Sequence, residues 1–332
     1  EVAQACINAP PVLVIGSGLS MGSGIRGMGK LAEYLIENVR VSEADQETWQ
    51  ALSEAIKTQG LEQALLASSV SPDLLAEIIR HTRAMVCQDD VAVLHTLLDE
   101  KATLPLSRLF THLFQSTHRT LHVVTTNYDR LVEYAADNAG CQHDAGFTQG
   151  YVRIRKSRPQ SGAAVPETAM RTVAIAKVHG SLDWFRRPNN TVMGSPLGIE
   201  YPSSLTPAIV TPGATKYEQA YDEPFRTAIT SADNYLSGGK AYLCLGYGFN
   251  DKHIQPKLVE RVRQQKVPIV ILAKNLTEAT KQFLKTCCHS QFLAVEESDT
   301  GSRIYNSANR DGCDVAVSGL WQLERFLETL IL

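Results

Sequence analysis

Polar residues follow a strand-like run at 121–124, where a buried strand is predicted to end. They are Thr125, Thr126, Asn127, Tyr128 and Asp129, and a helix-like stretch follows at once. Asn and Asp side chains offer the donors and acceptors that hold a ribose or a water. The same residue types are favoured just before the first turn of a helix, so a helix cap remains the alternative for this segment taken alone.

A segment rich in glycine and serine follows a second apolar run, at 12–15. Its candidate ligand-binding residues are Gly16, Ser17, Gly18, Ser20 and Ser23. Glycines between a buried strand and a helix let backbone N–H groups approach a pyrophosphate, and the helix N-terminus favours the negative charge. The spacing departs from Gly-x-Gly-x-x-Gly, and a purely structural turn remains the alternative.

Two further strand candidates, at 171–178 and 241–245, end in residues of the same kind. His179 follows the first, and its imidazole, with an unperturbed pKa of ~6.5, is suited to act as a general base or to orient a hydroxyl. The second run is followed by Gly246, Tyr247, Gly248 and Phe249, and then by Asp251. These glycines permit close approach to a ribose or phosphate, while Asp251 caps the next helix or contacts a hydroxyl. A structural histidine and a structural turn are the alternatives.

The elements that must position these residues alternate between strand and helix. Short β-branched runs predict strands at 12–15, 121–124, 171–178, 241–245, 267–273 and 292–295. Helical patterns occupy 28–39, 130–139, 217–236, 254–264, 277–285 and 319–330. This alternation predicts an α/β fold, a Rossmann-like parallel sheet with helices on both faces. Because the carboxyl ends of parallel strands share one edge, the four polar segments are candidates for a single site.

The segment 42–114 has a different character. Leucines and other apolar residues recur there at helical spacing, and Ser71-Pro72 marks one helix start. We therefore predict a helical subdomain at 42–114, inserted into a nucleotide-binding domain formed by 1–41 and 115–332. The spans 146–166, with a possible hairpin at 151–154, and 188–212 are predicted to be loops.

Composition narrows the class of protein. A net charge of −3 and a pI near 6.3 argue against a nucleic-acid-binding surface, and the basic stretch 153–158 is interpreted as a solvated hairpin or loop. No apolar run approaches the ~20 residues of a membrane span. Seven cysteines without regular spacing indicate a reducing, cytoplasmic setting, and no metal is expected. The pair Cys287-Cys288, followed by His289, is interpreted as a helix end beside a buried strand.

Taken in order, the four polar segments resemble the sirtuin superfamily, and more closely the sirtuin-like domains of bacterial anti-phage defence proteins. Residues 16–25, Gly-Ser-Gly-Leu-Ser-Met-Gly-Ser-Gly-Ile, resemble the family's Gly-Ala-Gly-Ile-Ser…Ser-Gly-Ile loop. Residues 125–129 are similar to its Thr-Gln-Asn-Ile-Asp strand end. Residues 177–184 resemble its catalytic His-Gly segment, and 246–251 its late glycine-rich turn. The resemblance extends over 12–273.

The resemblance implies a Rossmann-like NAD⁺-binding domain and an NAD⁺ glycohydrolase, with NAD⁺ as substrate. No cysteine lies between Cys141 and Cys244, so the zinc module of deacylating sirtuins is missing, and Arg26-Gly27-Met28-Gly29 replaces the usual Pro-Asp-Phe-Arg. Both departures favour NAD⁺ cleavage without an acyl-lysine substrate.

The pose implied by the resemblance assigns each candidate residue a place along NAD⁺. The pyrophosphate lies over 16–20, with Ser23 nearby, and the adenosine side lies near 246–249. The nicotinamide ribose lies between Asn127 and His179. In this pose Asn127 positions a water, His179 removes a proton, and Asp129, with Thr126 beside it, orients the carboxamide.

The resemblance also implies control of the activity, because free destruction of NAD⁺ would harm the host. Gating by homo-oligomerisation is expected, or by a partner such as a HerA-type ATPase, an Argonaute-like protein or a phage component. Direct nucleic-acid or membrane binding is not expected. Two alternatives stay open: a deacylase or ADP-ribosyltransferase, and a non-catalytic subunit that binds NAD⁺ or ADP-ribose.

Overall fold

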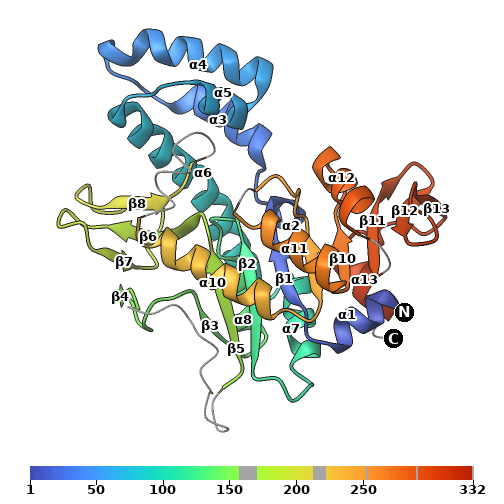
Figure 1. Cartoon of the computed structure of the whole chain (residues 1–332). Coiled ribbons are helices and arrows are strands. Elements are labelled where there is room, and N and C mark those ends of the chain that lie inside the picture. Colours follow the sequence, from blue (N-terminus) through green and yellow to red (C-terminus); the bar gives the residue numbers. More distant parts are fainter. Residues whose placement is uncertain (157–169, 212–221, 252, 289–290, 331–332) are drawn as a thin grey trace.

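The computed structural model describes residues 1–156, 170–211, 222–251, 253–288 and 291–330. Its centre is a nine-stranded sheet with the order β13-β12-β11-β10-β9-β1-β2-β5-β3 (Figure 1). All neighbouring strands are parallel except at one edge, where β12 and β13 run antiparallel. The strands are β1 (Val12–Ile15), β2 (Thr120–Thr125), β3 (Gln142–Asp144), β5 (Thr172–Lys177), β9 (Tyr242–Leu245), β10 (Ile269–Leu272), β11 (Phe292–Ser298), β12 (Gly301–Asn306) and β13 (Cys313–Val315).

Helices cover both faces of this sheet, which confirms the predicted fold class. Successive residues of β1 point to opposite faces, so Leu13 and Ile15 belong to one core and Val12 and Val14 to the other. The first core is completed by α1 (Val2–Asn8), α7 (Pro105–Leu113), α8 (Leu131–Asn138) and α13 (Leu323–Leu330). The second is completed by α10 (Phe225–Gly238), α11 (Gln255–Gln265) and α12 (Glu278–Cys287).

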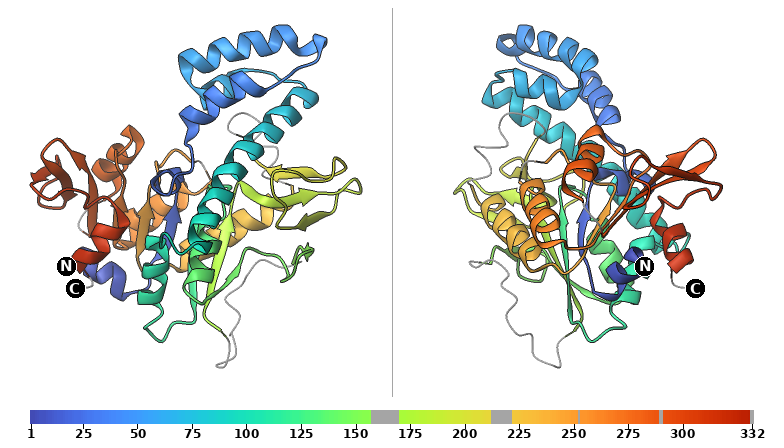
Figure 2. Two further views of the ribbon diagram at one scale, coloured as in Figure 1. Left: turned by 180° about the vertical axis from the view of Figure 1, so that it is seen from behind. Right: turned by 45° about the vertical axis from the view of Figure 1, so that its right-hand side comes forward.

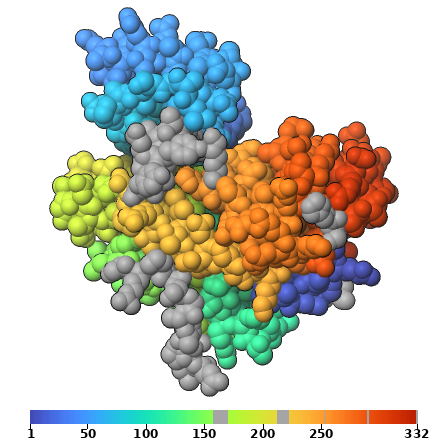
Figure 3. All heavy atoms as spheres, in the orientation of Figure 1, coloured from blue at the N-terminus to red at the C-terminus, as the bar shows by residue number. Residues whose placement is uncertain are grey.

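A helical lobe stands clear of the sheet (Figures 1 and 3). It consists of α3 (Met28–Asn38), a 3₁₀ turn (Glu43–Asp45), α4 (Gln46–Gln59), α5 (Leu61–Ala67) and the first part of α6 (Pro72–Leu98), which share an apolar core. Helix α6 begins as predicted, with Pro72 in its first turn and the Ser71 hydroxyl accepting from the Leu74 N–H. The same helix continues into the body, where Val93 and Leu97 pack against the core of the sheet (Figure 2). The helical lobe and the sheet are thus joined by one continuous helix.

A second, four-stranded antiparallel sheet corrects the prediction that 146–166 and 188–212 are loops. Its order is β4 (Arg153–Ile154), β7 (Val192–Gly194), β6 (Gly180–Arg186) and β8 (Thr206–Ile209). Three of these strands have two to four residues, too few to display an alternating pattern, and Pro207 is tolerated because β8 lies at the sheet edge. A hairpin does form around 151–154: the Thr148 N–H donates to the Ile154 oxygen at 2.9 Å and the Lys156 N–H to the Gly146 oxygen at 3.0 Å, while β4 also pairs with β7. Residues 157–166 lie outside the described residues.

Two arginines of the basic stretch, Arg153 and Arg155, are largely buried, contrary to the prediction that the stretch is solvated. Arg153 forms an ion pair with the buried Asp183, and the Arg155 guanidinium lies over the rings of Phe147 and Trp184. These cations therefore fix β4 against the core of the small sheet instead of presenting charge to solvent. Arg158 lies outside the described residues.

The remaining elements differ from the prediction mainly in their limits. Helix α10 begins at Phe225, whereas the predicted helix started at 217, and 217–221 lie outside the described residues. Helix α1 and the β12–β13 hairpin were not predicted. Cys287 ends α12 and Cys288 is buried ahead of β11, as predicted, while His289 lies outside the described residues. None of the described helices combines the length and apolar character that a membrane crossing requires.

Candidate functional site

The four polar segments lie side by side at one edge of the main sheet. They follow β9, β1, β2 and β5, which are consecutive neighbours and all parallel. From β1 the order proceeds through β2 to β5, whereas from β9 it proceeds in the opposite direction to β10 and β11 (Figure 1). The order therefore reverses between β1 and β9, and ligands of open α/β sheets bind outside such a reversal.

Close packing of two loops explains the glycines at this reversal. A Cβ atom on Gly16 would lie 2.5 Å from the Gly246 oxygen, and one on Gly246 would lie 2.2 Å from the Leu19 nitrogen. Gly246 also has a φ of +58°, which disfavours other residues. The Gly18 N–H donates to the Gly246 oxygen at 3.1 Å. The predicted tight turn after β1 is instead a short helix, α2 (Ser17–Gly22), because Gly16 allows its first turn to abut the β9 loop.

Three buried side chains form a hydrogen-bonded chain between β1 and β2. Asn127 Nδ2 donates to the Gly16 oxygen at 3.0 Å and to Ser20 Oγ at 2.8 Å. Ser20 Oγ in turn donates to Asp129 Oδ2 at 2.7 Å. The Thr125 hydroxyl fixes the start of the segment by donating to the Ile15 oxygen and accepting from the Asn127 N–H. Both hydrogens of the Asn127 amide are thereby used, so any contact with a water or a ribose hydroxyl falls to Oδ1.

Asp129 is buried, with 5% of its surface exposed. Its Oδ1 accepts from the Leu131 N–H at 3.2 Å, which caps α8, so the capping alternative describes a real contact. Buried Lys177 donates to the Asp129 backbone oxygen and to Glu133 Oε1. Burial raises the pKa of Asp129 to about 6, against the opposing effects of Lys177 and the Ser20 hydroxyl. Asp129 therefore changes charge near neutral pH.

His179 is held at the junction between the two sheets. The backbone turns sharply after it at Gly180, where φ is +87° and a Cβ would lie 2.1 Å from the Ala208 oxygen. The His179 oxygen accepts from the Val210 N–H at 2.9 Å, just beyond β8. The small sheet, absent from the sequence prediction, therefore fixes the position of this histidine.

Asp251 faces His179, a pairing that the sequence did not reveal. His179 Nε2 lies 2.8 Å from Asp251 Oδ2, off the straight line of a hydrogen bond, so the contact is an ion pair when the imidazole is protonated. Asp251 Oδ1 accepts from the N–H groups of His253 and Ile254 ahead of α11. Burial opposes ionisation, yet His179 and these N–H groups hold the pKa of Asp251 well below its usual range. Asp251 is thus a permanent anion beside the imidazole.

The aromatic side chains of the turn after β9 point into the core of the protein and not toward the edge of the sheet. Tyr247 and Phe249 are buried in the core of the sheet, and the Phe249 ring stacks on Phe283 with centroids 4.5 Å apart. The Tyr247 hydroxyl is buried with no hydrogen-bond partner among the described residues, and Asp251 helps burial to raise its pKa. The Gly248 oxygen accepts from the Thr277 hydroxyl at 2.6 Å.

The other predicted site residues lie at the same carboxyl edge of the main sheet. Ser17 and Gly18 are exposed on α2, Ser23 ends α2 half-buried, and half-buried Thr126 donates its N–H to the Ile15 oxygen at 3.4 Å. Within the described ranges, no group of three or more His, Cys, Asp or Glu residues is arranged to hold a metal ion.

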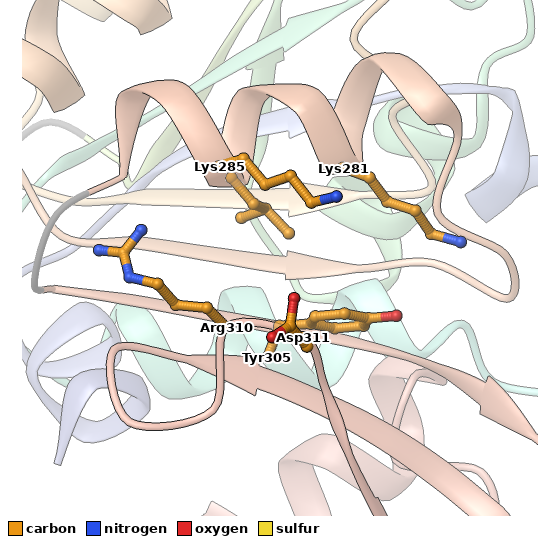
Figure 4. A pocket seen from close by; sticks show the side chains of 6 residues that line it. Lys281, Lys285, Tyr305, Arg310 and Asp311 are labelled. Carbon is orange, nitrogen blue, oxygen red and sulfur yellow. The ribbon is translucent and has the colours of Figure 1, made fainter.

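A small hollow of about 110 Å³ lies away from this edge, between α12 and β12 (Figure 4). It is lined by Lys281, Leu284, Lys285, Tyr305, Arg310 and Asp311. Figure 4 shows Arg310 extending away from the two lysines, so the cations do not converge on one point. No predicted site residue contributes to this lining.

Residues 121–290, more than half of the chain, match the SIR2-like domain family. The chain belongs to the SIR2-like family. The matched segment includes Asn127, His179 and the turn after β9, whereas β1 and α2 of this SIR2-like chain precede it. No curated protein matches the sequence.

Several solved Sir2 structures are similar to this SIR2-like chain over most of its length. One, from work on the mechanism and regulation of Sir2 enzymes, is 16% identical, with 84% of this chain and 88% of that chain covered and a TM-score of 0.42. A Sir2 homologue in complex with NAD is 14% identical, with 83% of each chain covered and a TM-score of 0.42. A mutant Sir2 homologue in complex with ADP-ribose is 14% identical, with 82% and 85% covered and a TM-score of 0.44.

Proposed function

We propose that this SIR2-like chain is an NAD⁺ glycohydrolase, which converts NAD⁺ and water to ADP-ribose, nicotinamide and a proton. The observation that carries the proposal is that Asn127 and His179 follow the neighbouring strands β2 and β5 at the edge where the strand order reverses, with Asp251 2.8 Å from His179. Family membership supports NAD⁺ as the substrate. The pyrophosphate then lies beside α2 and the adenosine side along the backbone of the turn after β9.

Asn127 is suited to place the attacking water. Departure of nicotinamide leaves an oxocarbenium-like ribose, and the enzyme then needs a water held close to the anomeric carbon. The hydrogen-bonded chain through Ser20 to Asp129 fixes the Asn127 amide with Oδ1 available to the water or to a ribose hydroxyl. In this proposal Asp129 orients Asn127 through Ser20, in addition to the expected role beside the carboxamide.

His179 is suited to take up the proton that the reaction releases. With Nε2 facing Asp251, a hydrogen on Nε2 leaves Nδ1 unprotonated and able to accept a proton from the water or a ribose hydroxyl. The imidazolium that results is stabilised by the Asp251 carboxylate. A positioned general base of this kind contributes on the order of 10²–10⁴-fold to a rate.

The biological role that fits this activity is that of an effector in bacterial anti-phage defence, gated by oligomerisation or by a partner protein. This part of the proposal follows from the resemblance described above. The helical lobe supports it, because it presents a large surface away from the main sheet (Figure 3).

Product analysis tests the proposed function. Purified protein, alone and together with the products of its neighbouring genes, is expected to release nicotinamide and free ADP-ribose from NAD⁺ in equal amounts. O-acyl-ADP-ribose or ADP-ribosylated protein would instead indicate a deacylase or a transferase. If NAD⁺ binds but is not turned over in every one of these mixtures, the chain is a regulatory subunit.

Turnover is expected to fall as the pH drops through about 6, because the Asp129 carboxylate then gains a proton and loses its charge. The hydrogen bond that it accepts from the Ser20 hydroxyl is weaker once the carboxyl group is neutral. Lys177 from β5 and Asp90 from α6 also influence this carboxyl group. Because burial raises its pKa from 3.8, Asp129 stabilises the fold at low pH and that contribution is lost as the pH rises through about 6. Its protonation therefore lowers turnover without unfolding the protein.

The pH profile of kcat/KM, measured beside a melting curve at each pH, checks this expectation. Asp129→Asn keeps the shape of the side chain but cannot titrate, so its profile should lack the fall near pH 6. An unchanged fall in Asp129→Asn would assign the titration to another group.

A further inference from the structure

Helix α6 contacts the chain just after three of the four site segments. Arg83, Asp89 and Asp90, which lie within two turns of this helix, make those contacts. The amino-terminal part of the same helix packs in the core of the helical lobe. One rigid element therefore connects the lobe with the candidate site (Figure 2).

Asp89 holds the loop that follows α2. Its Oδ2 accepts from the Arg26 backbone N–H at 2.9 Å, and both carboxylate oxygens accept from Arg26 Nε. The Arg26 guanidinium also donates to the Gln88 side chain at 3.0 Å. Arg26 directly follows Ile25, whose N–H donates to the Ser20 oxygen at 3.1 Å. Asp89 is therefore linked to the Ser20 backbone through the backbone of residues 25 and 26.

Asp90 repeats this arrangement on the segment that follows β2. Its Oδ1 accepts from the Arg130 backbone N–H at 2.7 Å, and Oδ2 accepts from Arg130 Nε and Nη2 and from the Tyr134 hydroxyl. Asp90 is fully buried, and Arg130 directly follows Asp129. Each aspartate thus captures both the backbone amide and the guanidinium of one arginine.

Arg83 completes the set on the segment that follows His179. Its Nε donates to the Leu182 oxygen at 2.8 Å, and its guanidinium carbon lies 4.8 Å from the ring centroid of Phe185 and 4.7 Å from that of Tyr201. Arg83 is fully buried although it carries a charge. A buried cation paired with backbone oxygens and ring faces is costly to move, so α6 and the small sheet are held together firmly.

We propose that Asp89 and Asp90 are positioning residues, which set the Ser20 and Asp129 segments for NAD⁺ from the helix that carries the lobe. The proposal rests on the proposed function for its ligand. It gives the lobe a mechanical route to the site: a partner that tilts α6 would shift both segments at once. In this proposal Asp89 positions the segment after β1, which contacts the pyrophosphate, and Asp90 positions the segment after β2, which carries Asn127.

Asp89→Asn is the informative variant, since Asn keeps an oxygen for the Arg26 N–H and Asp89 lies near the surface. The matched control is Glu77→Gln, which neutralises an acidic residue of the same helix whose partners, Arg80 and His81, belong to that helix and not to a site segment. We expect Asp89→Asn to weaken ADP-ribose binding about tenfold and to raise KM for NAD⁺ with kcat nearly unchanged. Glu77→Gln should match wild type. Arg26→Gln should behave like Asp89→Asn, and the double variant should lose no more than either single variant.

Hydrogen exchange gives a readout that does not depend on activity. In Asp89→Asn, the amides of 17–26 should exchange faster while those around α11 stay unchanged; loss of stability alone would raise both. Unchanged exchange in 17–26, or ADP-ribose affinity equal to wild type, overturns the positioning role. A wild-type chain that binds no ADP-ribose overturns the proposed function instead, and the exchange of 17–26 then decides the positioning role by itself.

Discussion

Asp251→Asn is expected to lower kcat for NAD⁺ hydrolysis by about 10²–10⁴-fold while leaving the fold intact. The Asn oxygen can still accept from the N–H groups of His253 and Ile254, so the cap ahead of α11 is kept. The new amide, however, offers a hydrogen to His179 Nε2. That places the imidazole hydrogen on Nδ1, the nitrogen that must accept a proton, and removes the anion that stabilises the imidazolium.

Two further variants separate this effect from loss of structure. Asp251→Ala should lose the same activity and also about 1 kcal/mol of stability, because it removes the cap. Glu260→Gln neutralises an acidic residue of α11 that pairs with Lys257 at the surface, and it should change neither property. Melting temperatures and steady-state kinetics of the three proteins make the comparison.

The dependence of Asp251 on His179 can be measured directly. His179→Ala should lose about as much activity as Asp251→Asn, and the double variant should be no worse than His179→Ala alone, because both changes disable one proton acceptor. Losses that multiply in the double variant would show that Asp251 acts on the ligand independently of His179.

The sequence indicated the main sheet and its polar edge because each carries a local signal. The runs 12–15 and 241–245 are apolar, short and followed directly by Gly, and 121–124, apolar apart from His122, leads through two threonines to Asn127, a pattern typical of buried parallel strands. The alternation of strand and helix predicts one parallel sheet. The polar residues after the strands must then lie at one edge of that sheet, whatever the order of the strands. The adjacency of β9, β1, β2 and β5 needed the structure.

Contacts inside the site could not be predicted, because they join distant parts of the chain. Ser20 and Asn127 are 107 positions apart, and their hydrogen bond depends on the register of β1 against β2. For Asp251 the sequence predicted a helix cap or a contact with a ligand hydroxyl, whereas its pairing with His179 depends on the turn at Gly180 and on β8. Asp89 and Asp90 look like ordinary polar residues of a long helix until α6 is placed against the strand ends.

Asn127→Ala is expected to reduce NAD⁺ turnover by at least ~10²-fold, since the water then has no fixed acceptor near the anomeric carbon. ADP-ribose affinity should stay within a few-fold of wild type, because the α2 and β9 loops that flank the pyrophosphate still pack through Gly16 and Gly246. The variant removes one donor each from the Gly16 oxygen, which still accepts from the Leu19 N–H, and from Ser20 Oγ, which still donates to Asp129, so a cost of about 1 kcal/mol of stability is expected. A loss confined to kcat therefore identifies a role in chemistry.

Ser20→Ala and Asn38→Ala provide graded comparisons for this result. Ser20→Ala keeps the Asn127 bond to Gly16 but removes the link to Asp129, so a smaller loss, about tenfold, is expected. Asn38→Ala removes an amide that donates to the Tyr34 oxygen at the end of α3 in the helical lobe, and turnover should be unchanged. Turnover of Asn127→Ala equal to that of Asn38→Ala would exclude Asn127 from the chemistry. Equal losses in Ser20→Ala and Asn127→Ala would instead place the essential contact at the Asp129 end of the hydrogen-bonded chain.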